Sequence, residues 1–174
     1  MEVRRTIRID AAPDRVWQIL GPDYVRAGDW ASSVYVSGAR QGEALPGAPA
    51  AGRTCETSLG AFTETIEAYD PAARRIAYSA TGAKMPGFVK RLVNEWTVRG
   101  HTGGGSEVSV RLRADLAVPF NLLMALPMKL QFRKVMREAT EDLRHYAETG
   151  RPHPRKAKAD RSAKARAAVA AQTA

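Results

Sequence analysis

The sequence predicts one α+β domain over residues 1–150, made of a seven-stranded antiparallel sheet and a long C-terminal helix. Two observations support this prediction. Short runs of alternating polar and apolar residues follow one another closely up to residue 117, whereas parallel strands would need crossovers of about a dozen residues or more. After Pro119 the apolar residues instead recur every three or four positions, which is typical of a helix.

The first elements alternate between strand and helix signals. Residues 2–9 have the two-residue period of a strand with one buried face. Residues 10–13 offer an N-cap and an early proline, and residues 16–20 supply an apolar helical face that Gly21 ends. A second helical or irregular piece is expected at 23–29. Two short helices should therefore follow the first strand.

The remaining strands come in quick succession. One follows Trp30 and places Val34 and Val36 on the same face, and the Gly- and Pro-rich stretch 42–52 then forms a loop. Turn signals separate five further strands, at 53–59, 61–69, 74–81, 92–99 and 107–117.

The long helix is expected to span about 20–28 residues beyond Pro119. Pro127 suits its first turn or a kink, and Gly150 with Pro152 ends it. Its apolar face consists of Phe132, Val135, Met136, Ala139, Leu143 and Tyr146.

The positive charge is unevenly placed along the chain. The net charge is +9, but residues 151–174 contain seven cations and one acid, so the remaining 150 residues carry only +3. This tail has one sizeable apolar residue, Val169, and we expect it to be a disordered basic tail. It is either a solubilising extension or a tether to nucleic acid or acidic lipid.

Several functional classes lack the residues they need. Three histidines, His101, His145 and His153, lie apart, so no metal site is expected. No nucleotide or cofactor motif occurs, and no stretch of about 18 apolar residues is present for a membrane span. A lone Cys55 and the absence of a signal-peptide pattern predict a cytoplasmic protein with a reduced, inert thiol.

A set of short segments carries a family resemblance. They are the run 12–20, Trp30 before a valine strand, Gly52-Arg53, and the stretches 63–71, 75–78, 94–98, 104–108 and 143–148. In this order and spacing they resemble the START-like (SRPBCC) helix-grip superfamily, in its polyketide cyclase/dehydrase branch, over residues 3–149. The resemblance implies a curved sheet wrapped around the long helix and an apolar cavity between them for a hydrophobic small molecule. It implies no particular reaction.

The candidate catalytic residue is Glu64. If Phe62, Ile66 and Ala68 point inward, Glu64 does too, because side chains two residues apart share a face of a strand. A carboxylate in an apolar cavity has a raised pKa and can act as a general acid or base. Arg53 on the neighbouring strand is expected to neutralise it or to bind a ligand carboxylate.

The same alternation gives a set of candidate ligand-binding residues. Tyr78 and Asn94 could donate hydrogen bonds to a ligand carbonyl, and the two tryptophans could form walls of the cavity. Each of these residues could instead serve packing or a structural ion pair. The full set is Trp30, Arg53, Tyr78, Asn94, Trp96, Phe132 and Met136.

Three functions remain open from the sequence. The first is a protein that binds a lipid or polyketide-like molecule, with an acid–base cyclase or dehydratase as its enzymatic form. The second is an interaction module that resembles the START-like domains which activate a chaperone, and it would have a tightly filled interior. The third is nucleic-acid binding through the basic tail, with an affinity that falls steeply with salt.

Overall fold

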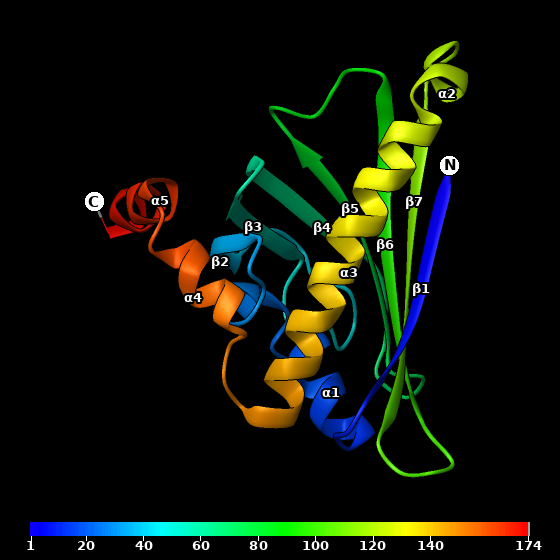
Figure 1. Cartoon of the computed structure of the whole chain (residues 1–174), viewed down its shortest axis with the longest axis vertical. Coiled ribbons are helices and arrows are strands. Elements are labelled where there is room, and N and C mark those ends of the chain that lie inside the picture. Colours follow the sequence, from blue (N-terminus) through cyan, green and yellow to red (C-terminus); the bar gives the residue numbers. More distant parts are fainter. Residues whose placement is uncertain (174) are drawn as a thin grey trace.

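The computed structural model describes residues 1–173, and Ala174 lies outside the described residues. Seven strands and a long C-terminal helix confirm the predicted α+β class (Figure 1). The strands are β1 Glu2–Ile9, β2 Val34–Ala39, β3 Gly52–Thr57, β4 Gly60–Asp70, β5 Arg75–Gly82, β6 Val89–Gly100 and β7 Ser106–Leu116.

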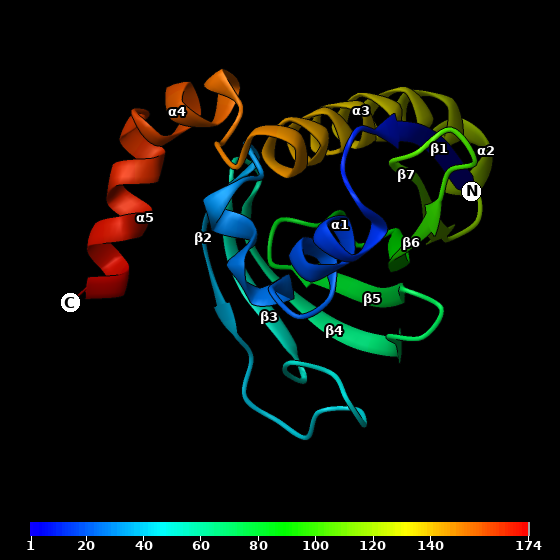
Figure 2. The same ribbon diagram turned by 90° about the horizontal axis from the view of Figure 1, so that it is seen from below.

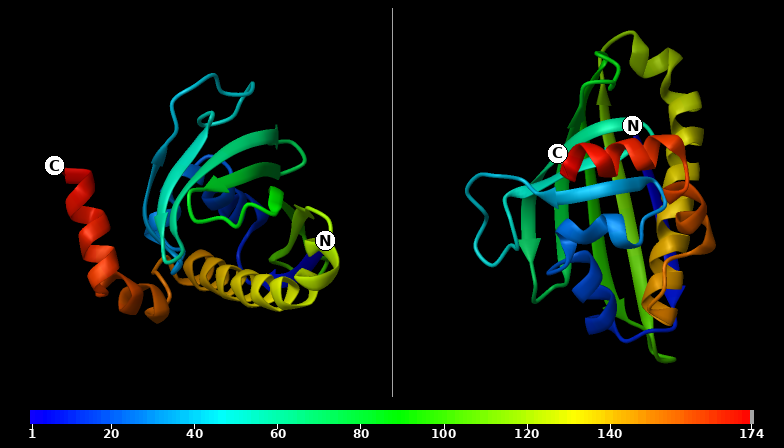
Figure 3. Two further views of the ribbon diagram at one scale, coloured as in Figure 1. Left: turned by 90° about the horizontal axis from the view of Figure 1, so that it is seen from above. Right: turned by 90° about the vertical axis from the view of Figure 1, so that its left-hand side faces the viewer.

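All seven strands form one antiparallel sheet, in the order β1-β7-β6-β5-β4-β3-β2. Figures 2 and 3 show the sheet curving around the short helix α1, Pro13–Leu20. The long helix α3, Ala125–Thr149, runs beside β1 and packs mainly on that strand. The prediction of a curved antiparallel sheet with a long C-terminal helix is therefore confirmed.

Two short helices follow β1, as the sequence predicts: α1 and the 3-10 helix η1, Tyr24–Asp29. Pro13 occupies the first turn of α1, and this helix buries Val16, Trp17, Ile19 and Leu20 against the sheet. The N-cap is Ala12, which offers no capping side chain.

The C-terminal helix begins after a short helix, α2 Phe120–Leu123, and Pro127 lies in the first turn of α3. Met136, Leu143 and Ala147 are buried on one face at helical spacing. Gly150 adopts a left-handed conformation with φ of 71° and its amide bonds the Tyr146 carbonyl, which ends the helix as predicted.

A β-bulge in β4 changes the predicted pattern of inward residues. The register with β5 shifts between Ile66, which pairs with Tyr78, and Ala68, which pairs with Ala77. The extra residue moves Ala68 off the concave face, so the prediction that it points inward is wrong. Tyr69 takes the inward position instead and packs on Trp17, with ring centroids 5.4 Å apart.

The structure differs from the predicted disordered tail. Two helices, α4 Pro154–Asp160 and α5 Ala163–Thr173, lie there, and α5 packs beside the edge strand β2. Arg155 ties the tail to the domain by bonding carboxylates of Glu141 and Asp142 on α3. Alanine also has the highest intrinsic helix propensity, so an alanine-rich segment needs little burial to become helical. Among the helices of residues 1–173, none is both long enough and apolar enough to cross a membrane.

Candidate functional site

A buried ion pair lies on the concave face of the sheet, where β3 meets β4. Arg53 and Glu64 are direct cross-strand partners, and Arg53 Nε donates to Glu64 Oε2 over 2.6 Å. The side chains are only 9% and 13% exposed. The alternation argument therefore placed both residues correctly, and their pairing matches the predicted neutralisation of the carboxylate.

Tyr24 of η1 completes this pair from above the sheet. Its hydroxyl donates to the same oxygen of Glu64 over 2.8 Å, and its carbonyl accepts from Arg53 Nη1 over 2.7 Å. The Arg53 guanidinium also lies 4.2 Å from the centroid of the Tyr24 ring, a cation–π contact. Tyr24 was not among the predicted site residues, because it lies in an irregular segment that has no period to indicate its direction.

Tyr78 of β5 and Trp96 of β6 extend the cluster across the sheet. Trp96 Nε1 donates to the Tyr78 hydroxyl over 3.2 Å, and the Tyr78 ring lies 5.2 Å from the ring of Tyr24. The Arg53 guanidinium is 5.4 Å from the Tyr78 ring centroid. Four predicted site residues, Arg53, Glu64, Tyr78 and Trp96, on four different strands, therefore lie in one contiguous group.

Burial fixes the protonation of the neutral members of this cluster. Loss of water raises the pKa of Tyr78 well above its ordinary value, and nearby Glu64 raises it further. Desolvation likewise raises the pKa of Tyr24, and it raises the pKa of the Cys55 thiol to about 12. Both phenols are therefore hydrogen-bond donors at neutral pH, and Cys55 is a poor nucleophile, as predicted.

Arg53 remains charged in this buried position. Desolvation lowers its pKa, but the attraction of Glu64 is one of the opposing effects that leave the pKa well above the ordinary value. The cluster is thus a fixed positive charge, a carboxylate partner and two protonated phenols, set into an apolar face of the sheet.

Three groups in this region keep hydrogen-bonding capacity that the described residues do not use. The Tyr78 hydroxyl accepts from Trp96, but its own proton has no acceptor within residues 1–173. Asn94, the cross-strand partner of Tyr78 on β6, makes no side-chain hydrogen bond in the same part of the chain. Glu64 Oε1 also lacks a donor there, since both donors use Oε2. Each is a donor or acceptor position that a ligand can use.

The other predicted ligand contacts surround the cluster with apolar surface. Trp30 and Met136 are buried members of the same core, and Phe132 is partly buried against it. None of these three makes a side-chain hydrogen bond to a described residue, which fits packing as well as contact with an apolar ligand. Their role in ligand binding stays a prediction.

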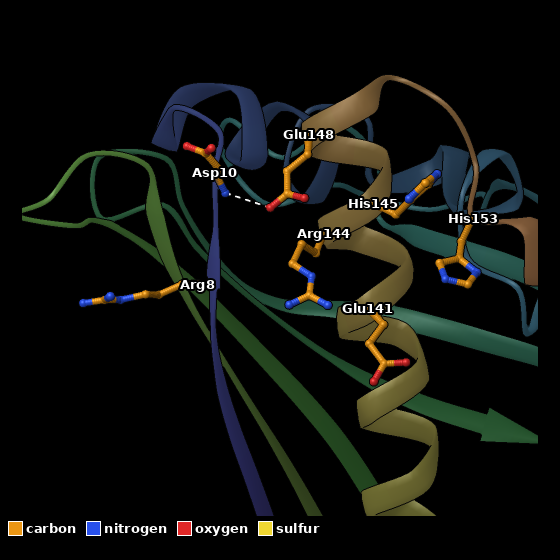
Figure 4. A pocket seen from close by; sticks show the side chains of 7 residues that line it. All are labelled: Arg8, Asp10, Glu141, Arg144, His145, Glu148 and His153. Atoms are coloured by element: carbon orange, nitrogen blue, oxygen red, sulfur yellow. Dashed lines mark hydrogen bonds between the residues drawn. The ribbon is translucent and has the colours of Figure 1, made fainter.

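Two pockets lie along the seam between β1 and α3. One of about 530 Å³ is polar, and Figure 4 shows its side chains, including Asp10, whose amide donates to Glu148 over 2.9 Å. The other, of about 400 Å³, lies between Val3 and Leu130 among basic side chains. Neither includes a residue of the Arg53–Glu64 cluster, so the apolar cavity expected inside the sheet stays a prediction.

No group of three or more His, Cys, Asp or Glu side chains in residues 1–173 is arranged to hold a metal ion. Of the three histidines, His145 and His153 stack edge to face with centroids 5.2 Å apart, while His101 lies in the turn before β7. The His145–His153 pair lines the polar pocket (Figure 4), whose lining includes no residue of the Arg53–Glu64 cluster.

Comparison with known proteins assigns the fold to a family. The family described as polyketide cyclase / dehydrase and lipid transport matches residues 1–148. The chain belongs to this family. A search of curated proteins found no match to the sequence.

Solved structures share the fold of this chain over 80–87% of its length. The protein XoxI from Bacillus cereus has a TM-score of 0.69 at 18% identity, covering 87% of this chain and 99% of its own. A protein from Nitrosospira multiformis has a TM-score of 0.66 at 21% identity, covering 86% and 98%. A START superfamily protein from Mycobacterium smegmatis has a TM-score of 0.62 at 12% identity, covering 80% and 94%. At these identities the similarity shows the shared fold, and the predicted START-like architecture is confirmed.

Proposed function

We propose that the protein binds a hydrophobic small molecule, a lipid or a polyketide-like chain, on the concave face of its sheet. The observation that carries this proposal is the group of free hydrogen-bonding positions on Glu64, Tyr78 and Asn94. They lie on neighbouring strands of an otherwise apolar surface. An apolar site with a few convergent polar groups is typical of small-molecule binding. Membership in a family whose description includes lipid transport supports the same function.

The available hydrogen bonds indicate which polar group the ligand carries. Tyr78 stays protonated at neutral pH and has a proton to give, so it fits a carbonyl or ether oxygen. Glu64 Oε1 accepts only, and it fits a ligand hydroxyl. A molecule with an oxygenated end and an apolar body would satisfy both groups while its body contacts apolar side chains such as Trp96.

We assign Glu64 first to binding and second to catalysis. Two donors already hold its Oε2, so the carboxylate positions Arg53 and Tyr24 whether or not a reaction occurs. Its free Oε1 is the atom that would accept a proton from an enolisable ligand in the cyclase or dehydratase form of the proposal. With such a substrate, lost turnover and preserved binding in Glu64→Gln would support catalysis, and unchanged turnover would exclude Glu64 as the acid–base residue.

A ligand titration tests the binding proposal. Fatty acids, glycerolipids and aromatic polyketides are titrated into the full chain by thermal shift and calorimetry, and any ligand found is compared between native protein and Tyr78→Phe. Loss of one hydrogen bond of about 0.5–1.5 kcal/mol weakens the affinity by roughly two- to tenfold. Tyr69→Phe is the matched control, since Tyr69 makes no side-chain hydrogen bond to a described residue. Equal affinities for both variants would remove Tyr78 from the site.

The absence of any ligand across this panel would favour the interaction module instead.

We propose the cytoplasm as the working compartment, because a lone buried thiol such as Cys55 is stable in a reducing environment.

A further inference from the structure

One end of the molecule exposes a group of large apolar side chains. Leu122 and Leu123 of α2 are 83% and 70% exposed, and Leu126 and Leu130 of α3 are 68% and 56% exposed. Isolated exposed leucines are common, but neighbouring ones that form a patch mark an interaction surface. We call these four residues the leucine tip.

Two loops of the sheet lie at the same end of the molecule as the leucine tip. In the β5–β6 loop, Phe88 stacks on Phe120 of α2 with ring centroids 4.7 Å apart. Figure 1 shows this loop and α2 at the same end of the molecule. The β3–β4 turn approaches that loop, since Gly60 lies against the Lys84 side chain, and it exposes Leu59 by 53%. Apolar side chains therefore lie both on α2 and on the β5–β6 loop, joined by the Phe88–Phe120 contact.

Cations outnumber acids around this apolar end, although Asp115 at the end of β7 is an exposed acid there. The segments 71–94 and 116–137, which form the β5–β6 hairpin and the start of α3, contain no Asp or Glu. Six of their cations take part in no ion pair within residues 1–173. They are Lys84, Lys90, Lys129, Arg133, Lys134 and Arg137.

The apolar and charged groups are ordered along α3. Leu126, Leu130, Lys134 and Arg137 follow one another at steps of three or four residues and are all exposed. With a rise of about 1.5 Å per residue, Lys134 lies roughly 12 Å and Arg137 roughly 16 Å beyond Leu126. Apolar faces of membrane-surface helices enter the lipid by about 5–10 Å. Leucines at that depth would place these two cations at the level of the lipid phosphates.

We propose that the leucine tip docks on the surface of a bilayer that carries anionic lipids. The two surfaces are complementary in charge, because unpaired cations outnumber acids near the apolar end and a negatively charged headgroup layer attracts them. A second copy of this chain fits the same patch poorly, because it would bring two sets of these cations together. This surface goes beyond the ligand site, and docking requires no ligand on the sheet, so the two proposals can fail separately.

Vesicle flotation tests the docking. The full chain is floated with vesicles of phosphatidylcholine alone and with equimolar phosphatidylcholine and phosphatidylglycerol. We expect binding to the anionic vesicles only. The variant Lys134→Ser/Arg137→Ser should bind roughly 25-fold more weakly, from about fivefold per cation. Leu122→Ser/Leu126→Ser should lose at least about tenfold.

Matched controls lie on the tail. Lys158 and Lys164 are exposed cations of α4 and α5, on the opposite side of the molecule from α2 (Figures 1 and 2). Lys158→Ser/Lys164→Ser removes the same charge and should bind like the native chain. Loss of binding in this variant alone would assign membrane contact to the tail and overturn the proposal, as would no binding to anionic vesicles.

A fluorescent reporter gives a second readout. The three native tryptophans are buried, so Leu123→Trp adds a reporter at the tip. Its emission should shift to the blue with anionic vesicles and be quenched by brominated acyl chains, whereas Leu45→Trp on the far loop should do neither. A second copy of the chain would instead cover the tip if two results were found together. The chain would dimerise with rising concentration in sedimentation, and Leu122→Ser/Leu126→Ser would abolish this dimerisation. Anionic vesicles would also cause no blue shift in Leu123→Trp.

Discussion

Replacing Arg53 by methionine should destabilise the protein strongly. The substitution replaces the guanidinium with an apolar side chain of similar length. It leaves the Glu64 carboxylate, whose side chain is 13% exposed, without its ionic partner. Removing one member of a buried ion pair costs about 3–5 kcal/mol, because the remaining charge stays desolvated. The Tyr24 carbonyl also loses its donor. We therefore expect the free energy of unfolding in urea, followed by circular dichroism, to fall by about 3–5 kcal/mol.

A second ion pair of the same sheet provides the control. Arg75 donates to Glu95 over 2.6 Å, but its side chain is 41% exposed. Exposed pairs contribute about 0–1 kcal/mol, so Arg75→Met should cost little. In the double variant Arg53→Met/Glu64→Leu the unpaired charge is gone, and part of the loss should be recovered. Equal costs for Arg53→Met and Arg75→Met would refute the view that Arg53 and Glu64 form a desolvated pair.

Three further predictions follow from single buried contacts. Cys55 should resist Ellman's reagent at pH 8 until the chain is unfolded. Because folding raises the pKa of this thiol from 9.0 to about 12, the stability that the buried neutral thiol contributes is complete below pH 9 and is lost toward pH 12. Cys55→Ala should therefore reduce the decline in the free energy of unfolding with rising pH, measured by alkaline urea titrations. Leu143 is fully buried on α3, so Leu143→Ala should lower the free energy of unfolding by about 2–5 kcal/mol, measured by thermal and urea unfolding. A decrease below about 1 kcal/mol would contradict tight packing around this side chain. Arg155→Ala should release α4 and α5 from α3 and speed trypsin cleavage after Lys158, whereas unchanged digestion kinetics would mean that the bonds to Glu141 and Asp142 do not hold the tail.

The sequence predicted the sheet and the face on which several candidate side chains lie, because side-chain direction in a strand follows a two-residue period. Arg53, Glu64, Tyr78 and Trp96 lie within regular parts of their strands, so alternation places each on the concave face correctly. The helix that begins beyond Pro119 was equally predictable, because its apolar residues keep a helical period up to Gly150.

The features that the sequence did not predict depend on contacts between distant segments. The bulge after Ile66 inserts one residue and reverses the faces beyond it, and no local signal indicates its position. Tyr24 reaches Glu64 only because η1 packs on β2 and β3. The tail helices are positioned by the bonds of Arg155 and by the packing of α5 beside β2, neither of which is indicated by apolar content alone.

The central claim, that an apolar molecule occupies the concave face beside Tyr78, is tested most directly by native mass spectrometry of the full chain purified from its own source. We expect a species heavier than the chain alone, whose extra mass is released by organic solvent as an apolar, oxygen-bearing molecule. The same species should be depleted in Tyr78→Phe and retained in Tyr69→Phe. A mass equal to that of the chain, together with no thermal shift across lipids and polyketides, would contradict the claim.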